Sequence, residues 1–145
     1  MEKFTSRSEQ ETYDFAKNYA KNLVGGEVLA LEGDLGAGKT VFSKGLAEGL
    51  GIKRNVNSPT FVIMKVYSDF EPMKQFQKSI KHFVHIDAYR LHTSEDLLAI
   101  GADEYFRRSD AVVVIEWPER IKKILPVKTR WLRFLAVERT RIIAY

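Results

Sequence analysis

Cysteine is absent from this chain of 145 residues, and proline occurs only four times. Without cysteine the protein has no disulfide framework, no cysteine-ligated zinc and no thiol nucleophile. Long apolar runs are also missing. The longest, residues 111–115 and the segment around residues 131–137, are far shorter than the roughly 18 residues of a membrane-spanning helix. The first residues do not combine a basic stretch with an apolar one, as an export signal would. We therefore expect a cytoplasmic protein without a membrane segment.

The composition is that of a globular protein. Hydrophobic residues make up 45% of the chain and charged residues 29%, which is too apolar for disorder and too evenly mixed for a fibrous chain. A length of 145 residues corresponds to one domain, since domains commonly contain about 100–200 residues. We predict a single domain over residues 1–145.

The net charge of +4 is unevenly distributed along the chain. Of the 23 Lys and Arg and 19 Asp and Glu, residues 120–145 hold eight basic side chains and one acidic side chain, Glu138. Residues 1–119 therefore hold 15 basic and 18 acidic side chains, so the excess of positive charge belongs to the C-terminal segment. Such a segment is either a contact for nucleic acid or an acidic partner, or a solvated surface. The lack of interleaved aromatic residues and of an RNA-binding motif favours the solvated surface.

Strand and helix patterns alternate along the chain. Ser8 and Glu11 have the spacing of a capping box and precede apolar residues at helical intervals. Apolar runs bounded by turn residues predict strands at residues 27–32, 60–67, 81–87, 111–116, 130–138 and 139–144, and periodic segments predict helices at 8–23, 39–50, 94–101 and 118–125. This alternation is typical of an α/β fold with a central, mostly parallel sheet flanked by helices on both sides.

Two glycines, Gly45 and Gly49, lie four residues apart in the helix expected at residues 39–50. This spacing indicates that the backbone of the helix packs closely against another element.

Residues 68–80 form a polar, lysine-bearing connection between two expected strands. We expect this connection to be the most mobile loop.

A glycine-rich segment follows the strand expected at residues 27–32 and opens the next helix. Residues 33–40, GDLGAGKT, fit the P-loop pattern G-x-x-x-x-G-K-[ST], in which backbone N–H groups and the helix N-terminus bind phosphate oxygens. In such a loop Lys39 reaches the β and γ phosphates and the Thr40 hydroxyl binds Mg²⁺. The expected nucleotide contacts are Gly33, Leu35, Gly36, Ala37, Gly38, Lys39, Thr40 and Val41.

Two carboxylates end apolar strands, at the sheet edge where open α/β folds bind ligands. A P-loop protein needs a carboxylate to hold its metal, and Glu116 is the expected one. Asp87 is either a second functional carboxylate or a residue of the strand end. The chain lacks the Asn-Lys-x-Asp motif with which GTPases recognise guanine, so ATP is the expected nucleotide.

Four segments together resemble the bacterial TsaE (YjeE) family. They are residues 31–40 (LEGDLGAGKT), 57–61 (NSPTF), 85–91 (HIDAYRL) and 115–119 (IEWPE). Their order and approximate spacing agree from about residue 8 to residue 126, which is much more specific than the P-loop alone. Two departures are the connection at residues 68–80, which is longer than in most relatives, and Ala88, which stands where leucine is common.

The resemblance implies a P-loop ATPase required to form threonylcarbamoyladenosine, the modified adenosine beside the anticodon of tRNAs that read codons beginning with A. It implies as partners TsaD, which transfers the threonylcarbamoyl group, and TsaB, its non-catalytic partner. ATP hydrolysis, weak in the free protein, then resets or regulates their complex.

Carried over to the matching positions, the resemblance implies roles for individual residues. Thr40 and Glu116 hold Mg²⁺, while Lys39, Glu116 and Asp87 are the catalytic residues. Trp117 lies beside the nucleotide, and residues 58–60 form a switch-like loop that faces the phosphates.

Alternatives stay open for several of these predictions. His85 shares a strand face with Asp87 and is expected to pack or to hydrogen-bond rather than to catalyse. Trp117 packs either under a nucleotide or into the core, and residues 58–60 form either a switch or an ordinary turn. tRNA is a partner either indirectly or by direct contact with the basic segment 120–145. The alternatives to an ATPase are a nucleotide-gated binding module in which hydrolysis is incidental, and a small-molecule kinase.

Overall fold

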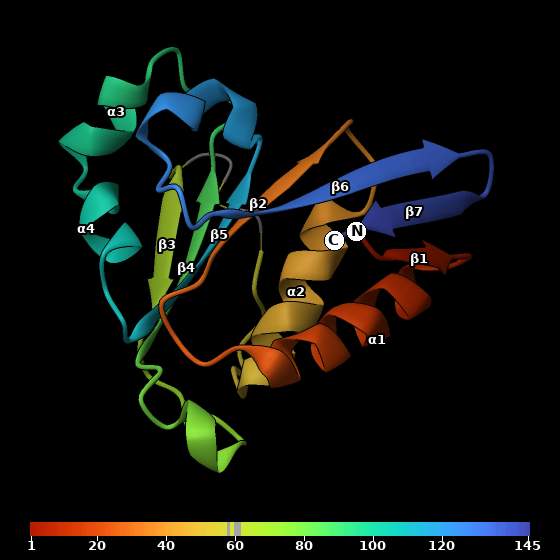
Figure 1. The fold of residues 1–145 in the computed structure, drawn as a ribbon, viewed down its shortest axis with the longest axis horizontal. Helices are drawn as coiled ribbons and strands as arrows, with labels where there is room; N and C mark the ends of the chain where they lie inside the picture. The colour runs from red at the N-terminus through yellow and green to blue at the C-terminus, as the bar shows by residue number, and fades with distance from the viewer. Residues whose placement is uncertain (58, 60–61) are drawn as a thin grey trace.

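The computed structural model describes residues 1–57, 59 and 62–145, and its strands form one seven-stranded sheet (Figure 1). The strand order is β1-β7-β6-β2-β5-β4-β3. The strands are β1 (Lys3–Ser6), β2 (Val28–Gly33), β3 (Met64–Tyr67), β4 (His82–Asp87), β5 (Ala111–Glu116), β6 (Arg130–Val137) and β7 (Thr140–Ala144). The four central strands, β6, β2, β5 and β4, are parallel, whereas β1, β7 and β3 pair antiparallel with their neighbours. The prediction of a sheet that is parallel in its centre and flanked by helices is confirmed.

The register of the central strands brings their carboxyl ends together. Asp87 at the end of β4 pairs with Glu116 at the end of β5, and Glu116 also pairs with Leu31 near the end of β2. All six residues of β5 are buried, because helices cover both of its faces. The two carboxylates predicted at strand ends therefore lie side by side at one edge of the sheet.

Helices pack on both faces of the sheet (Figure 1). They are α1 (Glu9–Tyr19), α2 (Lys39–Leu50), α3 (Ser94–Ala99) and α4 (Ala102–Phe106). One apolar cluster lies between α1, α2 and the sheet, and a second lies between the sheet, α3 and α4. Ser8 caps α1 as predicted, since its hydroxyl accepts a hydrogen bond from the Glu11 N–H at 3.1 Å. No helix in the described residues combines the length and the apolarity needed to cross a membrane.

The close approach predicted from Gly45 and Gly49 is present between α2 and α1. A Cβ atom on Gly45 would lie 2.3 Å from the carbonyl oxygen of Tyr13, and one on Gly49 would lie 2.5 Å from that of Lys17. Both obstacles are backbone atoms of α1, which cannot move aside without separating the helices. The two glycines thus allow α1 and α2 to pack more closely than larger residues would.

A Gly45→Ala substitution is expected to lower the free energy of unfolding by about 1–3 kcal/mol, because one methyl group overpacks this contact. Urea denaturation measures the loss. The control is Lys44→Ala on the same helix, for which we expect a change within about 0.5 kcal/mol. Equal denaturation midpoints for the two variants would contradict the importance of the close approach.

Several elements differ from their predicted bounds. The predicted helix at residues 8–23 becomes α1 followed by a 3₁₀ turn, η1 (Ala20–Asn22). The segment predicted as a helix at 118–125 is a kinked 3₁₀ segment, η3 (Pro118–Ile124), in which Ile121 leaves helical geometry at φ −128°. β3 starts only at Met64, because Ile63 has a left-handed φ of 67° that no strand residue adopts. The predicted start of this strand, residues 60 and 61, lies outside the described residues.

The connection at residues 68–80 is attached to the segment that follows the C-terminal end of α1. It contains a short 3₁₀ turn, η2 (Gln75–Gln77), and the buried side chain of Gln77 donates to the carbonyl oxygens of Ala20 and Leu23 at 2.7 and 2.8 Å. Met73 and Phe76 in the same connection are exposed. Gln77 therefore anchors this connection together with the buried Pro72 and Ile80 and the half-buried Phe70, and the other residues of the connection are exposed.

Candidate functional site

The glycine-rich loop between β2 and α2 adopts a conformation that depends on two of its glycines. Gly36 and Gly38 have φ values of 78° and 104°, in the left-handed region that residues with a Cβ rarely adopt. Gly38 is the N-cap of α2, so the free N–H groups of the first helical turn point into the loop. This is the backbone arrangement that binds phosphate at helix N-termini.

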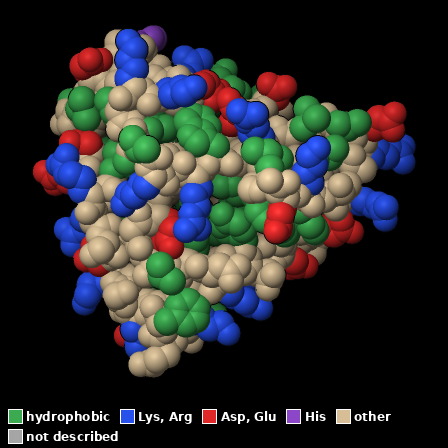
Figure 2. Space-filling view, in the orientation of Figure 1, with side chains coloured by type: hydrophobic (Ala, Val, Ile, Leu, Met, Phe, Trp, Pro, Cys, Tyr) green, Lys and Arg blue, Asp and Glu red, His purple; other side chains and the backbone are tan. Residues whose placement is uncertain are grey.

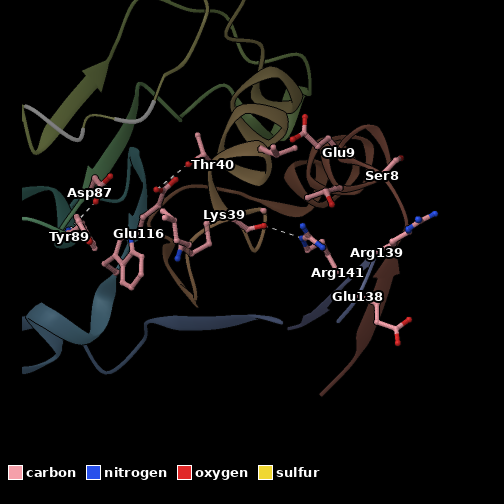
Figure 3. A pocket seen from close by; sticks show the side chains of 16 residues that line it. Ser8, Glu9, Lys39, Thr40, Asp87, Tyr89, Glu116, Glu138, Arg139 and Arg141 are labelled. Carbon is pink, nitrogen blue, oxygen red and sulfur yellow. Dashed lines mark hydrogen bonds between the residues drawn. The ribbon is translucent and has the colours of Figure 1, made fainter. Parts of the chain in front are cut away.

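A cavity of about 620 Å³ opens beside this loop (Figure 3). Nine of the residues predicted for the site line it: Leu35, Gly36, Gly38, Lys39, Thr40, Val41, Asp87, Glu116 and Trp117. The other two predicted residues do not line it. Gly33 ends β2, and Ala37 is 1% exposed and packs in the core cluster under α1 and α2. The fold therefore brings segments from residues 35, 87 and 116 to one cavity.

The Lys39 ammonium is held inside the loop. It donates to the carbonyl oxygen of Gly33 and, at 3.2 Å, to that of Asp34, and it lies 3.8 Å from the ring centre of Trp117. Burial lowers the pKa of Lys39 below its usual value, an effect that the nearby Glu116 carboxylate partly opposes. The lysine is thus a desolvated cation with weak neutral partners, which favours an exchange of those partners for an anionic ligand.

Thr40 and Glu116 offer oxygens to a metal ion. The Thr40 hydroxyl lies 3.3 Å from Oε2 of Glu116, and the Glu116 side chain is 3% exposed. Among the described residues no group of three or more His, Cys, Asp and Glu side chains could hold a metal alone. Mg²⁺ prefers oxygen ligands, and in phosphate-binding sites it takes only one or two of them from the protein. This donor set fits Mg²⁺ bound together with phosphate.

Asp87 is fixed by the turn that follows β4. Its carboxylate oxygen Oδ1 accepts a hydrogen bond from the Tyr89 N–H at 3.0 Å, and its own N–H donates to the Ile63 carbonyl oxygen at 2.8 Å. The residue is 4% exposed and lines the cavity. The carboxylate is therefore positioned beside Glu116 at the wall of the cavity.

Trp117 lies in the wall of the cavity with its backbone in the left-handed region, at φ 58°. Its ring centre is 4.9 Å from that of Tyr89. The indole is only partly buried, and it packs against the edge of the second apolar cluster. Trp117 thus touches both the core and the cavity.

The far end of the cavity consists of residues that the sequence interpretation did not assign to it: Ser8, Glu9, Thr12, Glu138, Arg139 and Arg141. They come from the start of α1 and from the β6–β7 hairpin, which Figure 3 shows opposite Asp87 and Glu116. Arg141 donates its Nε–H to the carbonyl oxygen of Gly36 at 3.0 Å. No local sequence motif predicts that these residues line the cavity. Their position depends on the long-range pairing of β1 with β7, which brings the two chain ends to the P-loop.

An Arg141→Ala substitution is expected to weaken nucleotide binding by roughly 2–12-fold, because one hydrogen bond that holds the P-loop contributes about 0.5–1.5 kcal/mol. Calorimetric titration with ADP measures the change. Arg133→Ala is the matched control, since the Arg133 guanidinium pairs with Glu32 at 3.0 Å on the surface. Equal affinities for the two variants would show that Arg141 does not support the loop.

Two groups of predicted residues, the loop at residues 58–60 and the basic side chains of residues 120–145, are not seen gathered at the cavity. The switch-like loop at residues 58–60 lies outside the described residues, apart from Pro59. The basic side chains of residues 120–145 are spread over several surfaces: Arg139 and Arg141 line the cavity, Arg120 reaches the Leu91 carbonyl oxygen, and Lys122 lies over Trp131. Figure 2 shows Lys and Arg side chains scattered among Asp and Glu on one face of the molecule.

Comparisons with known proteins agree with this arrangement. The chain matches the family model described as "Threonylcarbamoyl adenosine biosynthesis protein TsaE" over residues 6–143. It is similar to the tRNA threonylcarbamoyladenosine biosynthesis protein TsaE of Bacillus subtilis, with 46% identity over 86% of this chain and 71% of that protein. A Treponema pallidum protein of the same name is 41% identical over 86% of this chain and 84% of its own.

The fold also matches a solved structure. The crystal structure of Bacillus subtilis YdiB superposes with a TM-score of 0.76 at 37% sequence identity, and the match covers 98% of this chain and 82% of that chain. The range matched by the family model contains every residue that lines the cavity.

Proposed function

Because this chain belongs to the TsaE family, we propose that it binds and hydrolyses Mg²⁺–ATP to support the formation of threonylcarbamoyladenosine in tRNA. The proposed partners are TsaD, which transfers the threonylcarbamoyl group, and TsaB, with which TsaD is associated. In this proposal the protein is an ATPase subunit that acts on their complex, and it is not itself the transferase.

One observation supports the proposal above all others: a P-loop lysine and threonine share one cavity with two carboxylates from the ends of adjacent parallel strands. Phosphate binding alone needs the loop and the lysine, whereas hydrolysis also needs a metal ligand and a group that orients water. Thr40 and Glu116 supply the first, and Asp87 is available for the second.

The proposed roles follow from where each residue lies in the cavity. The loop N–H groups and Lys39 bind the β and γ phosphates, and Thr40 and Glu116 hold Mg²⁺, which neutralises phosphate charge when bound. Asp87 orients the attacking water or deprotonates it. Because the phosphates occupy the end near Glu116, the nucleoside extends toward α1 and the β6–β7 hairpin.

Steady-state release of ADP by the purified protein, alone and with a TsaB–TsaD complex, tests this function. We expect weak turnover alone and strong stimulation by the complex, because the proposed function of the protein is to act on that complex. Bound ATP without stimulation would favour a nucleotide-gated binding module instead. Stimulation by a small-molecule acceptor, with transfer of phosphate to it, would indicate a kinase.

A direct contribution of the basic segment to tRNA binding is proposed to be modest, because its side chains do not form one patch. Charge reversal at Lys122, Lys123 and Arg133 together is expected to weaken tRNA association several-fold and to reduce its dependence on salt. Charge reversal at Lys53, Lys74 and Lys78, which changes the net charge by the same amount elsewhere on the protein, is the control. Association that is unchanged by the first set would contradict a tRNA contact through this segment.

A further inference from the structure

A buried histidine contacts the carboxylate of Glu116. His85 lies in the middle of β4 and is fully buried, and its Nε2 atom is 3.2 Å from Oε1 of Glu116 on the neighbouring strand β5. Within the described part of the chain, the other ring nitrogen, Nδ1, is buried without a hydrogen-bond partner. Buried polar atoms of this kind are rare in proteins, so the placement of an imidazole here calls for an explanation.

The chemistry of the two groups determines which atom carries the proton. A carboxylate oxygen only accepts hydrogen bonds, so Nε2 of His85 donates to Oε1 of Glu116. A neutral imidazole has one N–H group, and Nδ1 then carries only a lone pair. In the neutral ring, Nδ1 leaves one lone pair unpaired in an apolar setting. A protonated ring would instead leave an Nδ1–H group unpaired and would also bury a positive charge, which is more unfavourable. The ring therefore serves as a donor toward Glu116.

The contacts of Glu116 distinguish its two oxygens. Oε1 faces His85, whereas Oε2 faces the hydroxyl of Thr40 at 3.3 Å. The Ser43 hydroxyl is 3.5 Å from Oε1 but only 3.0 Å from the Lys39 carbonyl oxygen, to which it gives its single proton. His85 is thus the firm donor to Oε1, and Oε2 is left on the side of Thr40.

We propose that His85 is a positioning residue that holds the Glu116 carboxylate so that Oε2 faces the metal position beside Thr40. This inference rests on the proposed Mg²⁺ site. A glutamate side chain has several rotatable bonds, and a donor fixed in a buried strand removes the freedom of one oxygen and directs the other. Hydrogen-bonding partners of metal ligands commonly change metal affinity or activity by about 10–100-fold when they are removed.

The test compares nucleotide binding with and without metal. Calorimetric titration with AMPPNP, a non-hydrolysable ATP analogue, is carried out in Mg²⁺ and in EDTA, and the ratio of the two Kd values gives the Mg²⁺ advantage. For His85→Ala we expect this advantage to fall by about 10–100-fold. The Kd in EDTA should stay within about threefold of the wild-type value, since the phosphate-binding loop is unchanged. His85→Gln, whose Nε2 can donate at a similar position, should recover most of the advantage.

Two controls separate positioning from a loss of packing. Ile86→Val removes one buried methylene from the opposite face of β4, which commonly costs about 0.5–1.5 kcal/mol of stability, and it should leave the Mg²⁺ advantage unchanged. Thermal denaturation of each variant confirms that it is folded during the titration.

The outcomes distinguish failure of this inference from failure of the proposed function. A wild-type protein that binds AMPPNP equally well in Mg²⁺ and in EDTA would contradict the Mg²⁺ site and the role of His85 with it. A wild-type advantage that His85→Ala retains would overturn the role of His85 alone. A folded His85→Gln variant that loses as much as His85→Ala would show that the hydrogen bond is not what matters.

Discussion

A Lys39→Met variant is expected to hydrolyse ATP at least about 100-fold more slowly than the wild-type protein, with or without partner proteins. Methionine fills the space of the lysine side chain but has no charge and no donor. The wild-type ammonium is desolvated beside Trp117, and among the described residues it donates to two backbone carbonyl oxygens, so nucleotide phosphates would replace weak partners with strong ones. In the proposed reaction the interaction of Lys39 with the transferred phosphoryl group would strengthen further as charge develops on that group.

The loss should also be visible in binding. A hydrogen bond to a charged group contributes about 1.5–3 kcal/mol, so the Kd for Mg²⁺–ATP should rise by roughly 10–150-fold. The stabilisation of the protein by Mg²⁺–ATP in a thermal shift assay should fall accordingly. The control is Lys44→Met, in the same helix and outside the cavity. A Lys39→Met variant that still hydrolyses ATP at the wild-type rate would contradict the proposed phosphate site.

The half of the site that is proposed to bind phosphate and metal is predictable from sequence because its geometry is local. A glycine-rich turn between a strand and a helix fixes the positions of Lys39 and Thr40, and the ends of parallel strands place Asp87 and Glu116 at the same edge. The apolar run at residues 111–116 identifies a strand buried on both faces, and it is found with those bounds. These features depend on periodicity and on the chemistry of a few residues.

The other half depends on long-range pairing that no local pattern encodes. β1 is only four residues long and was not predicted, yet it pairs with β7 at the opposite end of the chain. That pairing brings Arg141 to the P-loop and places Glu9, at the start of α1, at the same end of the cavity. Helix α4 was missed for a related reason, since it has only five residues and only Ile100 and Gly101 separate it from α3. Short elements are stabilised by their tertiary contacts more than by their own propensity.

The same limit applies to His85. From sequence, its position two residues before Asp87 indicated only a shared strand face, and a role in packing or hydrogen bonding was favoured over catalysis. The structure confirms a hydrogen bond, but the partner is Glu116 on the adjacent strand. Only the parallel register of β4 and β5 reveals which side chain a buried imidazole reaches.

A Glu116→Ala variant is expected to lose ATP turnover by at least about 100-fold and to lose support of tRNA modification as well. The substitution removes the proposed carboxylate ligand of Mg²⁺, while the loop N–H groups and Lys39 stay available for phosphate. Binding of ATP in EDTA should therefore be close to that of the wild-type protein. Threonylcarbamoyladenosine in tRNA is measured after reconstitution with TsaB and TsaD at nucleotide concentrations that saturate the variant.

This variant separates an ATPase that must turn over from a nucleotide-gated binding module. If hydrolysis resets the complex, a protein that binds ATP without hydrolysing it should give at most one round of modification for each complex. If the bound nucleotide only gates assembly, the saturated variant should support repeated rounds at the wild-type rate. Glu119→Ala is the matched control, because Glu119 is exposed and outside the cavity although its charge also acts on Lys39. Sustained modification by Glu116→Ala, with ATP bound and no ADP released, would contradict an obligatory ATPase and favour the nucleotide-gated module.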